Sequence, residues 1–333
     1  MILVTGGTGL LGAHLLYKLA EEGRVIRAIF RSEAKIDAVR KVFSYYSDDA
    51  DVLFEAIEWV KADVTDIPAL DKAFNNVKQV YHCAANLSFN PKDYKISRSV
   101  NVVGTANIVN LCLSHNVAKL CHVSSIATLG EDLKSPITEL TPWQPENNKH
   151  NIYAITKYDA ELEVWRGAQE GLQVIIVNPG VILGSGFWTS GTGELFRKID
   201  QGFNYITSGA VGVVGVNDVV KAMIALMNSE IANEQFIVVA ENMTYKQLLS
   251  LIVKSFGAVV KLNEVKRWQL LSLLQIEKLL CVFKLKKRSL YKANINSAFK
   301  QLHYDSTKLK SAIPFQYRPI SELITQVVKN YKS

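Results

Sequence analysis

Short apolar runs rich in valine and isoleucine alternate with longer helical patterns through the first 240 residues of the chain. The runs are ILVT (2–5), VIRAIF (25–30), IEWVKAD (57–63), VKQVYHCAA (77–85), AKLCHVSS (118–125), LQVIIVNPG (172–180) and EQFIVVA (234–240). Near-continuous apolar strands separated by helices are typical of a parallel sheet that is covered on both faces. Because crossovers between parallel strands are right-handed, the pattern predicts an α/β fold with a doubly wound parallel sheet of about seven strands.

A glycine-rich turn follows the first of these runs. The stretch VTGGTGLLG places Gly6, Gly9 and Gly12 at a regular spacing between a strand and an amphipathic helix. Glycine suits a tight turn whose backbone approaches a pyrophosphate and whose helix packs closely on the sheet. The N-terminus of that helix offers N–H groups and partial positive charge to phosphates, so the turn predicts a Rossmann-type dinucleotide site. The predicted contact residues here are Gly6, Thr8, Gly9, Leu10, Leu11 and Gly12.

The end of the second run bears on the choice of cofactor. A dinucleotide site usually has an acidic residue about 20 positions after the glycines, where it binds the adenine ribose. Here Arg31 stands 19 residues after Gly12, and no Asp or Glu ends the run. An arginine at this point suits a ribose 2′-phosphate, the alternative being a side chain that only faces solvent. We therefore expect NADP in preference to NAD.

The composition of the chain changes after about residue 180. Residues 183–215 are rich in Gly, Ser and Thr, and from residue 241 onward the chain has mostly helical patterns. We therefore predict a Rossmann domain formed by residues 1–177 and 208–240. A smaller, mostly helical substrate domain would then consist of residues 178–207 and 241–333.

A tyrosine and a lysine four residues apart could act together in proton transfer. Tyr153 and Lys157 in NIYAITKYDAE would share one face of a helix. The same spacing recurs at Tyr304 and Lys308, so spacing alone decides nothing. The first pair follows the run that ends at Ser125, at the sheet edge that also holds the glycine turn. We therefore expect a proton-transfer role for the first pair, and a chance or surface match for the second, which lies in the C-terminal tail.

Several further motifs occur in a fixed order over roughly residues 1–225. They are TGGTGLLG, ADV (62–64), HCAA (82–85), NVVGT (101–105), VSS (123–125), Tyr153 with Lys157, NPGVILG (178–184) and VNDVVKAM (216–223). In this order the chain resembles the extended short-chain dehydrogenase/reductases, within the NAD-dependent epimerase/dehydratase superfamily. The stretches NPGVILGSG and GVVGVNDVV are most similar to the dihydroflavonol-reductase and 3β-hydroxysteroid-dehydrogenase branch.

The resemblance implies a catalytic set of Ser125, Tyr153 and Lys157. Tyr153 would act as general acid or base at a carbonyl or carbinol oxygen, and Ser125 would hold that oxygen by a hydrogen bond. Lys157 would lower the pKa of Tyr153 by favouring the phenolate, and would also bind the nicotinamide ribose. The alternatives are an exposed helix pair for the tyrosine and lysine, and a serine that only caps the next turn.

The resemblance also implies further cofactor contacts at the ends of the predicted strands and on a following helix. They are Asp63 and Val64 at the adenine, Ala84 and Ala85 along the pyrophosphate and ribose, Asn101 supporting the active-site hydrogen bonds, and Pro179, Gly180 and Val181 at the nicotinamide carboxamide.

We therefore expect an NAD(P)-dependent oxidoreductase that interconverts a ketone or aldehyde and an alcohol by hydride transfer. A sugar-nucleotide epimerase or dehydratase that holds NAD(P) tightly is the alternative within enzymes. A non-catalytic dinucleotide sensor or scaffold is the alternative of another class. The substrate would be a small carbonyl or alcohol compound that is apolar or carries an anionic group. Helices around 95–115 and 151–170 could form a homodimer face.

Other features bear on the location of the protein and on metals. No run of about 18 uncharged apolar residues occurs, and no basic segment precedes the first apolar run, so we expect a cytoplasmic protein. None of the four cysteines forms a Cys-x-x-Cys pair, which favours reduced thiols. The six histidines lack the spacing of metal ligands, so no metal site is predicted.

The net charge of +7 comes from one segment, residues 261–292, which contains nine Lys or Arg and two Glu. Three interpretations stay open: a buried helix with a solvated basic end, a lid over an apolar substrate with an anionic group, or contact of residues 264–292 with an acidic membrane surface. Nucleic-acid binding is not expected, because one short basic run without a recognisable reading element is weak evidence.

Overall fold

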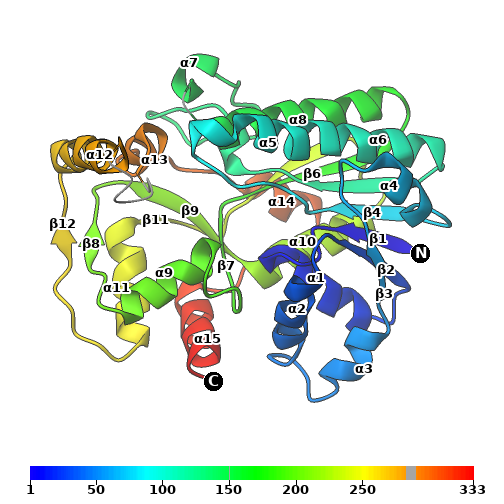
Figure 1. Ribbon diagram of the computed structural model, residues 1–333, viewed down its shortest axis with the longest axis horizontal. Coiled ribbons are helices and arrows are strands. Elements are labelled where there is room, and N and C mark those ends of the chain that lie inside the picture. The colour runs from blue at the N-terminus through cyan, green and yellow to red at the C-terminus, as the bar shows by residue number, and fades with distance from the viewer. Residues whose placement is uncertain (150, 283–289) are drawn as a thin grey trace.

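The computed structural model describes residues 1–149, 151–282 and 290–333. At its centre is a seven-stranded sheet in which every neighbouring pair of strands is parallel (Figure 1). In spatial order the strands are β10 (Glu234–Val238), β6 (Gln173–Pro179), β5 (Lys119–Val123), β4 (Gln79–His82), β1 (Ile2–Thr5), β2 (Ile26–Phe30) and β3 (Glu58–Lys61). The predicted doubly wound α/β fold is confirmed.

Helices cover both faces of this sheet (Figure 1). On one face lie α1 (Leu10–Glu21), α2 (Ile36–Phe43), α3 (Ala50–Glu55) and α10 (Val216–Met227), and on the other lie α4 (Ile67–Ala73), α6 (Gly104–Ser114) and α8 (Ile152–Gln169). Val4 of β1 is fully buried against the first group of helices. The adjacent residue, Leu3, points to the opposite face of the sheet and is fully buried against the second group. The strands are apolar on both faces because both faces pack against helices.

The order of the strands reverses beside β1. The chain builds β1, β2 and β3 outward in one direction, then returns to place β4 on the other side of β1. In open α/β sheets the connections after two such strands diverge and leave a crevice at their carboxyl ends, where ligands bind. The glycine turn after β1 and the chain after β4 therefore meet at the reversal point.

A second group of elements packs beside the carboxyl edge of the sheet. It contains a three-stranded sheet of β11 (Glu241–Thr244), β9 (Ala210–Gly215) and β7 (Val181–Leu183), and a short pair of β8 (Tyr205–Ile206) and β12 (Asn263–Glu264). Its longer helices are α9 (Gly191–Asp200), α11 (Tyr245–Ser255), α12 (Arg267–Val282) and α15 (Ile320–Lys332). Because β9 pairs with both β7 and β11, the small sheet joins chain from both predicted domains. The domain boundaries stay a prediction.

The remaining elements are short. They are α5 (Tyr94–Arg98), α7 (Pro145–Asn148), α13 (Lys292–Ser297) and α14 (Thr307–Ala312), the 3-10 turns Glu33–Lys35, Pro91–Asp93 and Ile126–Thr128, and a π-helical turn, Ser99–Val103, between α5 and α6. Among the described residues, no helix is long and apolar enough to cross a membrane.

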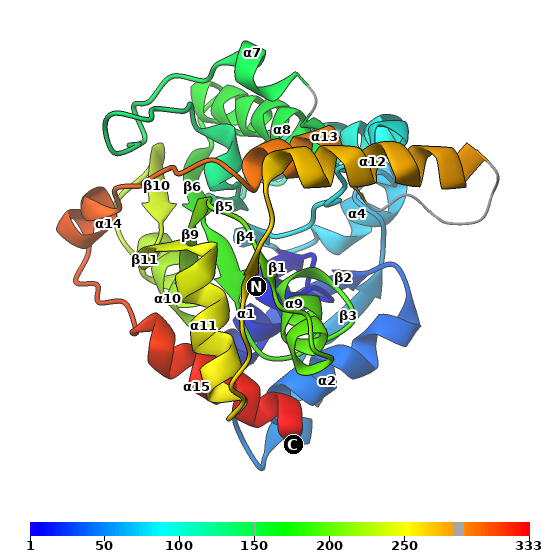
Figure 2. The same ribbon diagram turned by 90° about the vertical axis from the view of Figure 1, so that its left-hand side faces the viewer.

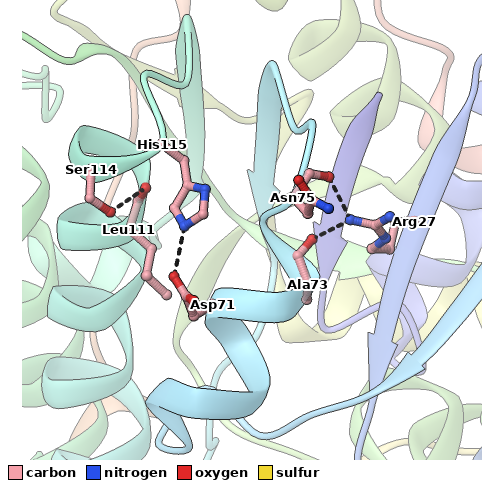
Figure 3. A network of polar contacts seen from close by, with 7 residues as sticks. All are labelled: Arg27, Asp71, Ala73, Asn75, Leu111, Ser114 and His115. Carbon is pink, nitrogen blue, oxygen red and sulfur yellow. Dashed lines mark hydrogen bonds and ion pairs between the residues drawn. The ribbon is translucent and has the colours of Figure 1, made fainter.

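Polar contacts fix α4 between the sheet and α6 (Figure 3). Arg27 is buried on β2, and its guanidinium donates to the carbonyls of Ala73 and Asn75 at 2.7 and 2.8 Å. These carbonyls lie at the C-terminal end of α4, where helix carbonyls lack partners within the helix. On the other side, Asp71 of α4 lies 2.8 Å from Nε2 of His115 at the end of α6. The helix that follows β3 is therefore held at both sides by side chains from neighbouring elements.

Candidate functional site

The turn between β1 and α1 has little room for side chains. Gly6 has a φ of +70°, and a Cβ there would lie 2.5 Å from the backbone nitrogen of Ala84. A Cβ on Gly12 would lie 2.2 Å from the carbonyl oxygen of Gly6. Only glycine fits both positions, because one needs a left-handed backbone and the other lets the helix pack against the turn. Gly9 caps α1 without a side-chain hydrogen bond, so the first N–H groups of the helix stay available.

A cavity of about 160 Å³ opens beside this turn. Seven residues predicted to contact the cofactor line it: Gly6, Thr8, Gly9, Arg31, Val64, Ala84 and Ala85. The remaining lining residues are Ile29, Phe30, Lys35, Ala62, Cys83 and Val100. The fold thus brings the ends of β1, β2, β3 and β4 to one hollow, as expected at the reversal point of the strands.

Charged side chains gather at the β2 and β3 side of the cavity. Arg31 follows β2, and its guanidinium lies 3.5 Å from the carboxylate of Asp63, which follows β3. Burial raises the pKa of Asp63, but hydrogen bonds from Thr65 and the nearby Arg31 outweigh it and hold this pKa below its ordinary value. Lys35 supplies a second cation to the lining, four residues after Arg31. This end of the cavity can therefore receive a negatively charged group.

Ser125 and Tyr153 meet at the end of β5. The Ser125 hydroxyl accepts a hydrogen bond from the backbone N–H of Ala127 at 3.1 Å and caps a 3-10 turn. Tyr153 lies in the first turn of α8 and shares a side-chain hydrogen bond with Ser125. Ser125 thus caps the next turn, as the alternative interpretation held, and its hydroxyl also contacts the phenol of Tyr153.

Lys157 lies one turn further along α8 and is 2% exposed. Its ammonium donates to the carbonyl of Val123 at 2.6 Å, and Nε2 of His122 lies 3.3 Å away. Burial lowers the pKa of Lys157 to about 8, although the nearby Glu161 carboxylate acts in the opposite direction. Val123 follows His122, which lies opposite His82 on β4, and cavity-lining Cys83 follows His82, so the ammonium lies at the ends of β4 and β5 beside the cavity.

The pKa of Tyr153 runs against the expectation from sequence. Burial raises this pKa above its ordinary value, and the hydrogen bond with Ser125 offsets only part of the rise. We expected Lys157 to lower it, but the Lys157 ammonium is bonded to the Val123 carbonyl and faces His122. The expected lowering is wrong for this arrangement, because desolvation of the phenol outweighs the other influences on it.

A buried carboxylate lies behind these groups. Glu161 is 4% exposed, four residues after Lys157 on α8. One of its oxygens accepts hydrogen bonds from Ser124 Oγ at 2.6 Å, Thr128 Oγ1 at 2.9 Å and Asn178 Nδ2 at 3.2 Å. Its other oxygen accepts from Gln235 Nε2 at 3.0 Å.

This carboxylate also supports the turn that carries Ser125. Asn178 donates to the Ser125 carbonyl at 3.1 Å as well as to Glu161. The Thr128 hydroxyl oxygen also lies 2.8 Å from the Ser125 carbonyl, so its single proton is shared between this carbonyl and Glu161. Burial raises the pKa of Glu161, and the donors and the charge of Lys157 lower it less. Glu161 therefore ties the turn after β5 to α8.

Asn101 connects α8 to the chain after β4. Its side-chain amide donates to the Asn86 carbonyl and to Thr156 Oγ1, both at 3.0 Å, and its oxygen accepts from the Asn86 N–H at 2.6 Å. Thr156 lies between Tyr153 and Lys157 on the same helix. These bonds join Asn101 to α8, and the supporting role that the resemblance implies for Asn101 stays a prediction.

The predicted residues Leu10, Leu11, Gly12, Pro179, Gly180 and Val181 are not among those that line the cavity. Leu10, Leu11 and Gly12 form the first turn of α1. Pro179 ends β6 and Val181 begins β7, and a Cβ on Gly180 between them would lie 2.4 Å from the Gly212 carbonyl. The cofactor roles of these residues stay predictions.

The second tyrosine–lysine pair lies elsewhere in the structure. Tyr304 packs against the small cluster that includes Ile137, and Lys308 donates to the carbonyl of Gln235 at 2.9 Å. Tyr304 is thus half-buried rather than on the surface, but neither residue lines the cavity.

Sequence reasoning missed three residues of this site. Lys35 could have been found from its position four residues after Arg31, a spacing that keeps side chains close on a helix or turn. Glu161 stands at the same spacing after Lys157, where a second charge on one helix face is a usable signal. His122 lies inside an apolar run, and nothing in that run indicates that it faces the lysine.

Comparisons with known proteins give a consistent result. A family model described as NAD dependent epimerase/dehydratase family matches residues 2–240. Sterol demethylase protein B of Methylococcus capsulatus is 29% identical over 260 residues, 77% of this chain and 74% of that protein. Anthocyanidin reductase of Arabidopsis thaliana is 24% identical over 294 residues, 78% of this chain and 82% of that protein. The crystal structure of gox2253 superposes with a TM-score of 0.81 at 24% identity, covering 100% of this chain and 98% of the other.

Proposed function

Because the chain belongs to the NAD dependent epimerase/dehydratase family, we propose that it is an NADP-preferring oxidoreductase that interconverts a ketone or aldehyde and an alcohol. One observation carries the proposal. The buried Lys157 ammonium donates to the Val123 carbonyl at the end of β5, beside the strand that leads to cavity-lining Cys83, and Tyr153 on the same helix is hydrogen-bonded to Ser125. In this proposal the dinucleotide would therefore lie beside the proton-transfer groups.

The residues beside the glycine turn fit the phosphates of a dinucleotide. Gly9 leaves the first N–H groups of α1 without a side-chain cap, and the close packing of Gly6 and Gly12 keeps the turn free of side chains. Such N–H groups attract anions. At about 160 Å³ the hollow is smaller than the roughly 300–1,000 Å³ typical of small-molecule sites. It would therefore hold only part of the cofactor, the adenosine end between β2 and β3.

Two cations support NADP over NAD. Arg31 and Lys35 both line the cavity at the end of β2, where a ribose 2′-phosphate would lie. The Arg31 guanidinium, which now lies 3.5 Å from the Asp63 carboxylate, would instead pair with the phosphate. Asp63 and Val64 would then contact the adenine, and Ala84 and Ala85 the pyrophosphate and ribose.

The reaction needs a proton and an oriented substrate oxygen. NADPH, when bound, supplies the hydride. Ser125 would hold the carbonyl oxygen by a hydrogen bond, and Tyr153 would donate its phenolic proton to that oxygen as charge develops there. A raised pKa keeps Tyr153 protonated for reduction. Lys157 would bind the nicotinamide ribose and, with Asn101, position α8. Pro179, Gly180 and Val181 would contact the carboxamide.

The surroundings of Tyr153 favour an apolar substrate. The rings of Phe89 and Tyr153 lie 5.9 Å apart between centroids and are tilted by 57°. Phe89 belongs to the chain after β4, which also lines the cavity. An aromatic face beside the proton donor suits a substrate with a ring or hydrocarbon portion at its carbonyl group.

A Tyr153→Phe substitution tests the catalytic assignment. General acid catalysis typically contributes about 10²–10⁴-fold, so NADPH oxidation with carbonyl substrates should fall by that factor while NADPH affinity, measured by fluorescence, stays within about twofold. Tyr158→Phe is the matched control, because Tyr158 lies on the same helix but stacks on Trp143 at 4.5 Å. Turnover retained in Tyr153→Phe would refute the assignment.

The same assay separates the enzyme classes. An oxidoreductase consumes NADPH in proportion to product. A sugar-nucleotide epimerase or dehydratase would convert its substrate with no net change in the cofactor, which absorbance and product analysis together would reveal. The homodimer face predicted from helices 95–115 and 151–170 stays a prediction.

A further inference from the structure

Helix α12 carries apolar side chains both on the side that faces the protein and on the side that faces solvent. Leu274 is 3% exposed and faces the body of the protein. Trp268, Leu273 and Ile276 expose 64%, 44% and 55% of their surface. At about 100° per residue these three side chains fall within roughly 140° of the helix circumference. Exposed Gln269, Ser272 and Gln275 share this side of the helix, so the outward side of α12 is a mixed face whose three apolar side chains no described part of the chain buries.

The exposed apolar character continues along the chain that leads into α12. β12 precedes α12 and pairs with β8, and in Figure 2 both β12 and α12 lie on the side turned to the viewer. Seven of the eighteen exposed large apolar residues of the described chain belong to residues 203–205 and 259–276, which include or lead into these elements. We call them the α12 surface: Phe203, Tyr205, Val259, Val260, Trp268, Leu273 and Ile276. Solitary exposed apolar residues are ordinary, whereas such a concentration marks an interaction surface.

Cations surround this surface. Lys261, Lys266, Arg267 and Lys278 are all exposed, and no carboxylate in residues 1–149, 151–282 or 290–333 lies within ion-pair distance of them. Glu264 is the one exposed carboxylate within the stretch from Lys261 to Lys278. The surface thus combines exposed aromatic and aliphatic side chains with unneutralised positive charge.

Two other occupants fit this combination poorly. Trp268, Leu273 and Ile276 do not line the cavity beside the glycine turn, so a ligand in that cavity would not cover them. A second copy related by two-fold symmetry would place the same patch against itself, and so would bring like cations together. Neither a ligand in the cavity nor a second copy of the chain explains why exposed cations and exposed apolar side chains occur together on the α12 surface.

We propose that the α12 surface binds the anionic surface of a lipid bilayer. Trp, Tyr and aliphatic side chains enter the headgroup boundary, while lysine and arginine contact anionic lipid headgroups. Because no described helix is both long and apolar enough to span a bilayer, α12 would lie along the membrane surface. Such docking would bring the enzyme to apolar substrates that partition into lipid.

Flotation of the full chain with lipid vesicles tests the proposal. Vesicles of phosphatidylcholine mixed with phosphatidylglycerol should retain the protein, and vesicles of phosphatidylcholine alone should not. Each cation near a membrane contributes about a fivefold increase in affinity, so the triple variant K266Q/R267Q/K278Q should bind roughly a hundredfold more weakly. Raised salt should weaken binding of the unmodified protein in the same direction.

Apolar variants provide the matched comparison. Trp268→Ser with Leu273→Ser and Ile276→Ser should abolish flotation, whereas Val52→Ser with Leu140→Ser should not, because Val52 and Leu140 are 71% and 91% exposed outside this surface. Circular dichroism would confirm that each variant is folded. Trp268 should also give a blue shift of fluorescence with anionic vesicles, and Trp268→Phe should remove the shift.

Three outcomes would overturn the proposal. The first is the absence of vesicle binding, and the second is equal binding by the serine triple variant and its control. The third is a dimer, detected by light scattering, that the serine substitutions on α12 dissociate, because the surface would then join two copies of the chain.

Discussion

Removing the charge of Glu161 should shift the protonation of Lys157. Glu161→Gln keeps the size of the side chain, and its amide oxygen can accept the bonds from Ser124, Thr128 and Asn178 that now reach one carboxylate oxygen. The amide nitrogen would face Gln235, whose own amide can rotate to present its oxygen. The hydrogen-bond network can therefore persist while the negative charge disappears.

The magnitude follows from the spacing of the two residues. Side chains four residues apart on a helix lie about 6 Å apart, and at an effective dielectric constant of about 20 two unit charges at that distance interact by about 2.8 kcal/mol. This energy corresponds to roughly a hundredfold change in proton affinity. The pKa of Lys157, about 8 in the native protein, should therefore fall to about 6 in the variant.

The substitution should lower the pH at which Lys157 loses its proton, because the ammonium loses a stabilising negative neighbour. As the pH rises through about 8, Lys157 of the native protein loses its proton and its charge. In Glu161→Gln the same loss should occur near pH 6, so at pH 7 the charged fraction of Lys157 should fall about tenfold. Carbon-13 NMR of lysine labelled at Cε, assigned through a Lys157→Met variant, would measure the pKa directly.

A matched substitution on the same helix isolates the electrostatic cause. Glu163→Gln removes a half-buried carboxylate that pairs with Arg166 at 2.8 Å. It should leave the Lys157 titration unchanged. If Glu161→Gln and Glu163→Gln gave the same Lys157 pKa as the native protein, the reasoning that assigns Glu161 the role of charge partner would be wrong.

Two further predictions concern the cavity. Arg31→Ala and Lys35→Ala should each weaken NADPH binding by roughly 10- to 150-fold, since a hydrogen bond to a charged group is worth about 1.5–3 kcal/mol, and should leave NADH affinity unchanged in a fluorescence titration. Equal losses for both cofactors would contradict the assignment of a 2′-phosphate site. Gly12→Ala should lower the free energy of urea unfolding by about 1–3 kcal/mol, because its Cβ would meet the Gly6 carbonyl at 2.2 Å. Gly9→Ala, whose Cβ would lie 3.4 Å from that carbonyl, should cost less than about 1 kcal/mol, and an equal cost for both would argue against the steric explanation.

Much of the site could be located from sequence because its signals are local. The glycine turn was recognisable because Gly6 and Gly12 respond to constraints within a few residues of chain, a positive φ and a close backbone approach. The shared position of Tyr153 and Lys157 followed from helix periodicity alone. The meeting of Ser125 with Tyr153 could be anticipated because carboxyl ends of parallel strands share one edge.

The electrostatic state of the site could not be predicted in this way. Whether the Tyr153 pKa rises or falls depends on how desolvation compares with the charges around it, and both come from elements distant in sequence. The position of the Lys157 ammonium depends on the Val123 carbonyl and His122, which reach it only once α8 packs on β5.

The sequence by itself determined the alternation of strands and helices, the glycine turn and the spacing of the reactive side chains, because each arises from backbone preferences over a few residues. The tertiary structure alone decided that Lys35 joins Arg31 at the cavity and that Glu161 is buried behind Lys157. It also decided that one side of α12 remains uncovered. Burial and long-range contact depend on how whole elements pack, and the residues of a single segment do not specify that packing.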